Sequence, residues 1–309
     1  GQGLAIPMAT DIAFSLGVLS LLGSRVPLSL KIFLTAFAVV DDIGGILVIA
    51  IFYSSHVSYG YILVAVLLYI LLYFIGKRGA TNKIFFLVIG VVIWYLFLQS
   101  GIHSTISGVI LAFVIPAKPR LDVGKYIEHI RHTIAGFPVM ESGSIVLTNE
   151  QIAKLKEVES ASDRVISPLQ SFEDNLHGAV NYLILPLFAF VNAGVVFSGG
   201  GELVGDVGIA VAAGLLFGKF AGIYFFTWLA IKIKLTPMPP GMTWTNLSGI
   251  ALLGGIGFTV SLFIANLSFG ANFPILLNQA KFGVLSGTIL SGLLGYIVLW
   301  IVLPARRRK

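Results

Sequence analysis

The sequence contains no cysteine and few charged residues. Of its 309 residues, 11% are charged and 57% are hydrophobic. The lack of cysteine excludes disulfides, thiolate metal sites and cysteine nucleophiles. The scarcity of charge excludes a soluble globule of this size, because too little polar surface is present to cover it. With a mean hydropathy of +0.95, the chain is predicted to lie in lipid.

Motifs of several other protein classes are also missing. The sequence has no Gly-rich phosphate loop, no zinc-ligand spacing, no Gly-x-Ser-x-Gly elbow and no heptad repeat. We therefore expect neither an enzyme of those classes nor a bound cofactor.

Long apolar runs stand in place of charge, and they predict helices rather than a membrane β-barrel. Barrel strands alternate apolar and polar residues, whereas the runs at 61–76 and 84–98 are apolar on every side. The chain is therefore predicted to be an all-α polytopic membrane protein. Nine spans are expected, at 4–21, 28–53, 61–76, 84–98, 103–116, 179–198, 207–231, 246–269 and 282–304.

Basic residues segregate between the loops that join these spans. Alternate loops must lie on opposite sides of the membrane, and one set of loops contains nearly all of the Lys and Arg residues. The other set contains only Lys281, which we expect to act as an anchor at a span edge. The positive-inside rule then places the carboxyl terminus in the cytoplasm. The net charge of +6 reflects this topology, and no nucleic-acid partner is expected.

The segment 117–178 differs in composition from the rest of the chain. It carries nine of the 14 acidic residues and is predicted to be a cytoplasmic polar loop. It separates two groups of transmembrane helices, at 1–116 and 179–309. Within it, Thr148 to Gln151 followed by apolar Ile152 and Leu155 predicts a short amphipathic helix with an N-terminal cap.

Three carboxylates remain within the predicted spans: Asp11, Asp41 and Asp42. Each costs about 2.5 to 3.5 kcal/mol at lipid depth, so a chain with no use for them would be expected to lack them. The alternative is structural, because an intramembrane acid can pair with a base and lock two helices. Three acids, two of them adjacent, favour a functional site.

The adjacent pair lies midway along the 28–53 span, where successive side chains point about 100° apart. One carboxylate can therefore meet an incoming ion while the other meets a neighbouring helix. Mutual repulsion and removal from water disfavour the doubly ionised pair, so one carboxylate is expected to hold a proton near neutral pH. Such a group can exchange its proton for a cation.

One base and two interrupted helices accompany these acids. Lys219 lies well inside a span and is the natural partner of one acid, in a pairing that is either structural or broken when an ion binds. Pro7 and the glycine-rich segment 254–259 each predict a break in a span. Broken helices expose backbone groups that line a cavity or bind an ion, and a pair of breaks is typical of a transporter site. Close helix packing is the alternative for glycine, as the Gly283 and Gly287 spacing suggests.

Titratable groups near span ends are candidates for a response to pH. His103 begins a predicted span, and His177 ends the polar loop four residues after Glu173. Histidine titrates in the range where a transporter would sense pH. A solvated helix cap is the alternative for a lone interfacial histidine.

Five segments together resemble the NhaA-type sodium/proton antiporters, over the chain from about residue 3 to its end except for 117–178. The Asp-Asp pair in this context is highly specific. The segments are Ala9–Phe14, Leu22–Pro27, Asp41–Gly44, Leu185–Phe190 with Asn192–Gly194, and Gly255–Ser261.

The resemblance implies an inverted-repeat transporter fold, of which this family is a known example, with two interrupted helices that cross. It implies that a homodimer in the bacterial inner membrane exchanges Na⁺ or Li⁺ for H⁺ and that pH regulates this exchange. The sequence also departs from the family pattern. Relatives carry further helices before the Pro7 break, including a dimerisation hairpin, and the loop 117–178 is longer than expected for the family.

The resemblance assigns roles to individual residues. Asp41 and Asp42 would bind the ion, with Thr10 as a further oxygen ligand, because hard cations prefer such oxygens. The helix crossing would contain Thr10, Asp11, Thr259, Gly255 and Gly257. Lys219 would compensate helix carboxyl-terminal ends and pair with Asp41. His103, Glu173 and His177 would take part in the pH response.

Three other functions remain open. An intramembrane aspartyl protease also needs two buried carboxylates, but its Tyr-Asp and Gly-x-Gly-Asp motifs are absent. A passive cation channel would favour rings of polar residues over a buried lysine opposite acids. A proton-coupled symporter of an organic solute differs from an exchanger only in a transport assay.

Overall fold

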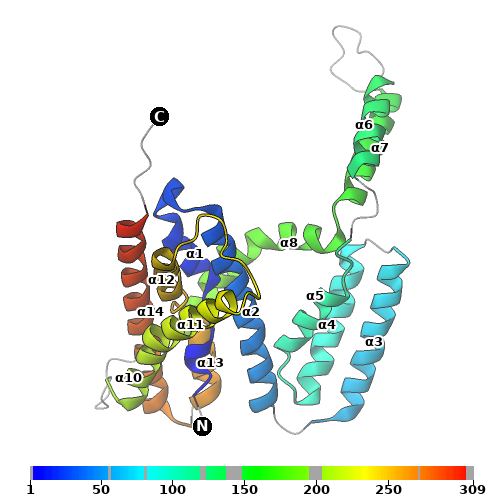
Figure 1. Cartoon of the computed structure of the whole chain (residues 1–309). Helices are drawn as coiled ribbons and strands as arrows, with labels where there is room; N and C mark the ends of the chain where they lie inside the picture. Colours follow the sequence, from blue (N-terminus) through cyan, green and yellow to red (C-terminus); the bar gives the residue numbers. More distant parts are fainter. Residues whose placement is uncertain are drawn as a thin grey trace. The chain divides into compact units, whose positions relative to one another are not determined.

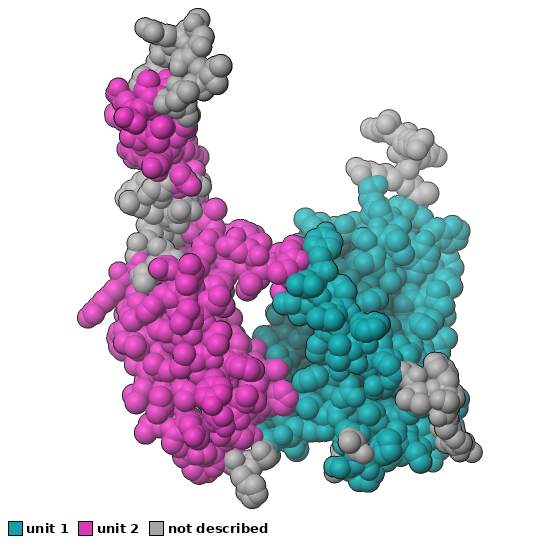
Figure 2. All heavy atoms as spheres, turned by 180° about the vertical axis from the view of Figure 1, so that it is seen from behind, with its two compact units in different colours: residues 1–54, 181–309 teal, residues 55–180 magenta. Residues whose placement is uncertain are grey.

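The computed structural model describes residues 3–54, 57–79, 82–118, 123–136, 148–194, 204–270 and 272–303. Within these ranges all regular structure is helical (Figure 1). The chain divides into two compact units, formed by residues 1–54 with 181–309 and by residues 55–180 (Figure 2). The division at 116 and 178 expected from composition stays a prediction.

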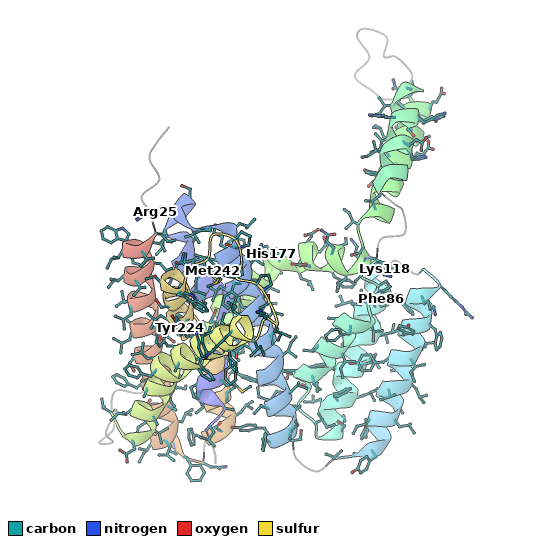
Figure 3. All side chains as sticks on the ribbon, viewed as in Figure 1. Arg25, Phe86, Lys118, His177, Tyr224 and Met242 are labelled. Atoms are coloured by element: carbon teal, nitrogen blue, oxygen red, sulfur yellow. The ribbon has the colours of Figure 1, made fainter. Side chains whose placement is uncertain are left out.

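The second unit contains a bundle of three apolar helices, α3 (Tyr59–Lys77), α4 (Lys83–Ser100) and α5 (Thr105–Val114). Their shared core is apolar and includes Leu72, Phe86 and Ile93, all fully buried. Figure 3 labels Phe86 on α4. The Tyr69 hydroxyl donates to the Ser107 carbonyl at 2.7 Å and joins α3 to α5. A buried tyrosine needs such a partner for its hydroxyl.

The segment predicted as a polar loop contains three helices, α6 (Val123–Ala135), α7 (Asn149–Val165) and α8 (Pro168–Ala179). Only α7 was predicted. Its capping signal is confirmed, because the Thr148 amide donates to Gln151 Oε1 at 2.9 Å and the Gln151 amide donates to Thr148 Oγ1 at 3.3 Å. The prediction missed α6 and α8 because their charged faces mask the apolar spacing that packs α6 against α7.

The first unit is built around the long helix α14 (Pro274–Val302), which packs on α10 (Asp206–Ala213), α12 (Trp244–Leu253) and α13 (Phe258–Phe269) (Figure 1). Small residues allow this packing, as the glycine spacing predicted. A Cβ on Gly283 would lie 2.3 Å from the Gly208 carbonyl oxygen, so the two backbones are in direct contact there. At the far end of α14, Arg25 Nη2 donates to the Trp300 carbonyl at 2.9 Å (Figure 3).

Five of the described helices are long and apolar enough to cross a membrane, or six when the pair α12 and α13, bent by 45°, counts as one span. The five run over Leu28–Phe52, Tyr59–Lys77, Lys83–Ser100, Asp206–Lys232 and Pro274–Val302. The chain is thus a multi-pass helical membrane protein. The count of nine spans stays a prediction.

The helix that carries Lys281 begins earlier than the span expected at 282–304, and the side chain is buried rather than directed to the membrane surface. Because α14 begins at Pro274 rather than near 282, Lys281 lies about two turns inside the helix. It is 8% exposed, and its Nζ donates to the Gly194 carbonyl at 2.9 Å. That carbonyl lies just beyond the carboxyl-terminal end of α9 (Leu185–Asn192), where the helix dipole favours a cation.

Candidate ion-binding site

The first predicted break lies between the short 3-10 helix η1 (Ile6–Met8) and α1 (Ile12–Ser20). Pro7 stands in the first turn of η1, where its missing amide costs nothing. The chain is then extended from Ala9 to Asp11. The Asp11 carboxylate caps α1 by accepting from the Phe14 amide at 3.1 Å.

The second predicted break separates α12 from α13 at Gly254–Gly257. Its glycines are required by close backbone approach. A Cβ on Gly255 would lie 2.3 Å from the Leu215 carbonyl oxygen. A Cβ on Gly257 would lie 2.4 Å from Ser261 Oγ and 3.0 Å from the Ala9 carbonyl oxygen, which belongs to the first break.

The two breaks satisfy each other's backbone groups. The Asp11 amide donates to the Ile256 carbonyl at 2.6 Å, and Thr10 Oγ1 donates to the Gly254 carbonyl at 2.7 Å. The Asp11 carboxylate accepts from Thr259 twice, from its amide at 3.1 Å and its hydroxyl at 2.7 Å. Backbone freed by a break inside a membrane needs such internal partners. The predicted grouping of Thr10, Asp11 and Thr259 is therefore present as a set of hydrogen bonds.

Asp11 compensates a helix end in this arrangement. Its carboxylate lies at the amino-terminal end of α13 as well as that of α1, where the partial positive charge of a helix favours an anion. The side chain is fully engaged and 4% exposed. Both of its oxygens already accept hydrogen bonds, which join α1 to the start of α13.

Lys219 connects the first break to the aspartate pair. It begins α11 (Lys219–Lys232), directly after the π-helical turn η4 (Gly214–Gly218). Such turns are frequent at functional sites. Its Nζ pairs with Asp41 Oδ2 and also donates to Thr10 Oγ1 at 3.0 Å. The Lys219 and Asp41 side chains are only 9% and 13% exposed.

Asp41 and Asp42 lie in α2 (Leu28–Phe52) and have different surroundings. Asp41 is bound to Lys219. In the part of the chain that the structure describes, Asp42 Oδ1 is buried and has no hydrogen-bond partner. A carboxylate oxygen that is shielded from water and lacks a hydrogen bond favours the binding of a proton or a cation. The two adjacent residues thus differ, because Asp41 is paired with Lys219 whereas Asp42 has a buried oxygen to which no described residue hydrogen-bonds.

A cavity of about 690 Å³ adjoins the ion pair. Asp41 and Lys219 line it together with Met8 and the rings of Phe33 and Phe37. Sequence reasoning missed these aromatic residues, although Phe37 stands one helical turn before Asp41 and a helical register could have placed it on the same face.

The residues predicted to respond to pH lie in the second unit. His103 lies in the turn between α4 and α5, with its Nδ1 3.1 Å from Thr105 Oγ1. Glu173 and His177 lie one turn apart on α8, where Figure 3 labels His177. At the start of α8, the Leu169 amide donates to the carbonyl of Pro116, which follows the carboxyl-terminal end of α5. Partial burial lowers the pKa of the His103 imidazole below its ordinary 6.5.

Comparison with known proteins places the chain in a family. It matches the family model described as Na+/H+ antiporter 1 over residues 1–299. It is 95% identical over 308 residues to the Na(+)/H(+) antiporter NhaA of Bacteroides thetaiotaomicron, covering 100% of this chain and 70% of that protein. It is 81% identical over 307 residues to the protein of the same name from Bacteroides fragilis, covering 99% and 70% of the two chains.

A more distant relative gives the same result. The Na(+)/H(+) antiporter NhaA of Phocaeicola vulgatus is 63% identical over 305 residues, which cover 98% of this chain and 68% of that protein. The resemblance noted in the sequence is thereby confirmed. The chain belongs to the Na+/H+ antiporter 1 family, whose members are secondary transporters rather than enzymes.

Proposed function

We propose that this antiporter exchanges sodium ions for protons at Asp42 and Asp41, with Lys219 competing with the ion for Asp41. The observation that carries the proposal is the contrast between the two carboxylates. Asp41 is paired with Lys219, whereas Asp42 has a buried oxygen without a partner among the described residues. A proton on Asp42 satisfies that oxygen in the sodium-free state.

Sodium binding reverses this arrangement. A hard cation requires several oxygen ligands, and Asp42 alone supplies too few. When Asp42 loses its proton, the ion can bind its carboxylate and draw on Asp41 and the Thr10 hydroxyl, both of which now contact Lys219. Lys219 must then release Asp41. Protonation of Asp42 expels the ion and restores the ion pair.

Apart from Thr10, the residues of the two helix breaks support the site without binding the ion. Asp11 and Thr259 hold the breaks together through two hydrogen bonds, and Gly255 and Gly257 permit the close approach. This division of roles assigns ion exchange to α2 and structural support to α1 and α13.

Several further assignments rest on the family. We propose that the protein lies in the bacterial inner membrane with its carboxyl terminus in the cytoplasm, as the basic loops indicate, and that it works as a homodimer. His103, Glu173 and His177 are proposed to modulate activity with pH. No cofactor is required for the proposed exchange.

The test uses everted membrane vesicles with an imposed proton gradient. Addition of sodium or lithium should dissipate the gradient in the wild type, and Asp42→Asn should abolish the response because a neutral amide cannot exchange a proton for a cation. Asp206→Asn is the matched control, since Asp206 is an exposed acid in the first turn of α10. A sodium response that survives in Asp42→Asn would refute the site assignment. An organic solute required for the response would indicate a symporter.

A further inference from the structure

Lys219 has a third neighbour that the exchange mechanism does not use. Its Nζ lies 5.5 Å from the centroid of the Phe37 ring, within the range of a cation–π contact. We propose that Phe37 is a positioning residue that holds the Lys219 ammonium when sodium displaces it from Asp41. The inference rests on the proposed function, because it concerns the state in which the ion pair is broken.

The geometry places the ring beside both ends of the ion pair. Phe37 precedes Asp41 by four residues on α2, so the two side chains lie on one face of the helix. Both line the cavity of about 690 Å³ that Lys219 also lines. Because Nζ is already 5.5 Å from the ring centroid, the ammonium can leave Asp41 and remain within reach of the ring.

Burial makes such a partner necessary. The Lys219 side chain is 9% exposed, so a displaced ammonium has little access to water. Its other partner is Thr10 Oγ1, and the same oxygen is a proposed sodium ligand. Sodium thus competes for both polar partners of Lys219 at once. An aromatic face attracts the ammonium but binds sodium far less well than carboxylates do, so Phe37 can hold the lysine without competing for the ion.

The sign of the effect follows from which state depends more on the ring. In the sodium-free state Asp41 dominates the stabilisation of Lys219, whereas in the sodium-bound state the ring supplies most of it. A weaker attraction between the Phe37 ring and the Lys219 ammonium therefore destabilises the sodium-bound state. The KM for sodium should rise by roughly threefold to thirtyfold, with a smaller change in kcat.

Progressive fluorination of the ring tests the inference. Phenylalanines with one, two and three ring fluorines, introduced at position 37 of the full chain, withdraw electron density from the ring face while nearly preserving its shape. We expect the sodium KM in everted vesicles, and the sodium Kd of the purified protein by calorimetry, to increase stepwise. Phe37→Trp keeps an aromatic face and should retain the wild-type KM. Phe37→Leu removes the aromatic face and should raise the KM.

Phe33 provides the matched control. It lines the same cavity, four residues before Phe37, and the described residues show no cation–π contact to its ring. The same fluorinated series at position 33 should leave KM and Kd unchanged. A flat response at position 37, or equal responses at both positions, overturns the inference.

The outcome also separates this inference from the proposed function. If Asp42→Asn abolishes exchange but fluorination at position 37 has no effect, only the role of Phe37 is wrong. If the wild type neither binds nor exchanges sodium, both are overturned.

Discussion

Two buried lysines in the first unit have different kinds of partner. Lys219 pairs with the Asp41 carboxylate, whereas Lys281 donates to the Gly194 carbonyl beyond α9. Both side chains are shielded from water by apolar helices. The carboxylate carries a full charge and can exchange one cation for another, but a carbonyl at a helix end offers only part of a charge. The partner, rather than burial, therefore distinguishes the lysine that we assign to the proposed exchange site.

The surroundings of the two lysines support the same distinction. Around Lys219 lie a cavity, a helix break and a carboxylate oxygen without a partner among the described residues. Near Lys281, a second hydrogen bond holds the end of α9, in addition to the one from Lys281 to Gly194. In it, Asn266 Nδ2 donates to Asn192 Oδ1 at 2.8 Å. The first lysine has room to move, and the second lies in a region of fixed contacts.

The largest effect is expected when Lys219 loses its charge. Lys219→Met leaves Asp41 buried without a counter-ion, which should lower the free energy of unfolding in detergent by about 3 to 5 kcal/mol. Adding Asp41→Asn to Lys219→Met should recover most of the loss, because the uncompensated charge is then gone. Thermal unfolding followed by tryptophan fluorescence measures both. If the double variant is no more stable than the single one, the ion pair is not the source of the effect.

Removal of the Thr10 hydroxyl should have an intermediate effect. Thr10→Val eliminates the hydrogen bonds to the Gly254 carbonyl and to Lys219, leaving a carbonyl of the second break unpaired. The expected loss of stability is about 1 to 3 kcal/mol, together with a higher KM for sodium. Thr10→Ser retains the hydroxyl and should behave like the wild type in both measurements. A normal sodium KM in Thr10→Val would exclude Thr10 as an ion ligand.

Replacement of Lys281 should affect stability alone. Lys281→Met keeps an apolar stem in α14 but removes the hydrogen bond to Gly194, so the expected loss is about 1 kcal/mol. The sodium KM should remain at the wild-type value, because the Gly194 carbonyl that Lys281 contacts is not among the proposed ion ligands. A changed KM with normal stability would show that Lys281 acts on the exchange site and would contradict the comparison.

The sequence predicted the parts of this site that depend on residue type and local breaks. Carboxylates at lipid depth, Lys219 and the two interrupted spans could be recognised because each is costly in a membrane helix. The sequence also predicted α7 from its capping signal, which is a local interaction. Features that depend on tertiary neighbours could not be recognised in this way.

Lys281 and Phe37 illustrate that limit. The helix α14 begins at Pro274, and Leu276 and Leu277 pack against a buried cluster that includes Val211 of α10. The hydropathy of residues 274–281 alone does not reveal that tertiary contact. Phe37 is one of 23 phenylalanines in an apolar chain, so its type carries no signal. Phe37 differs from Phe33 only through its contact with Lys219, which lies on another helix.

The smallest effect is expected at His103 in the second unit. This base contacts a hydroxyl, Thr105 Oγ1, rather than a carboxylate or a carbonyl. Burial lowers the pKa of this imidazole from 6.5, so the group is neutral at pH 7 and charges in the folded state only at lower pH. The unfolded chain takes up this proton first as pH falls, and stability therefore decreases below pH 6.5. His103→Gln should reduce that acid-side loss and leave stability above pH 7 unchanged. Exchange activity should lose part of its pH dependence on the acid side of neutrality, because the imidazole titrates there, and an unchanged activity profile would remove His103 from the proposed pH response.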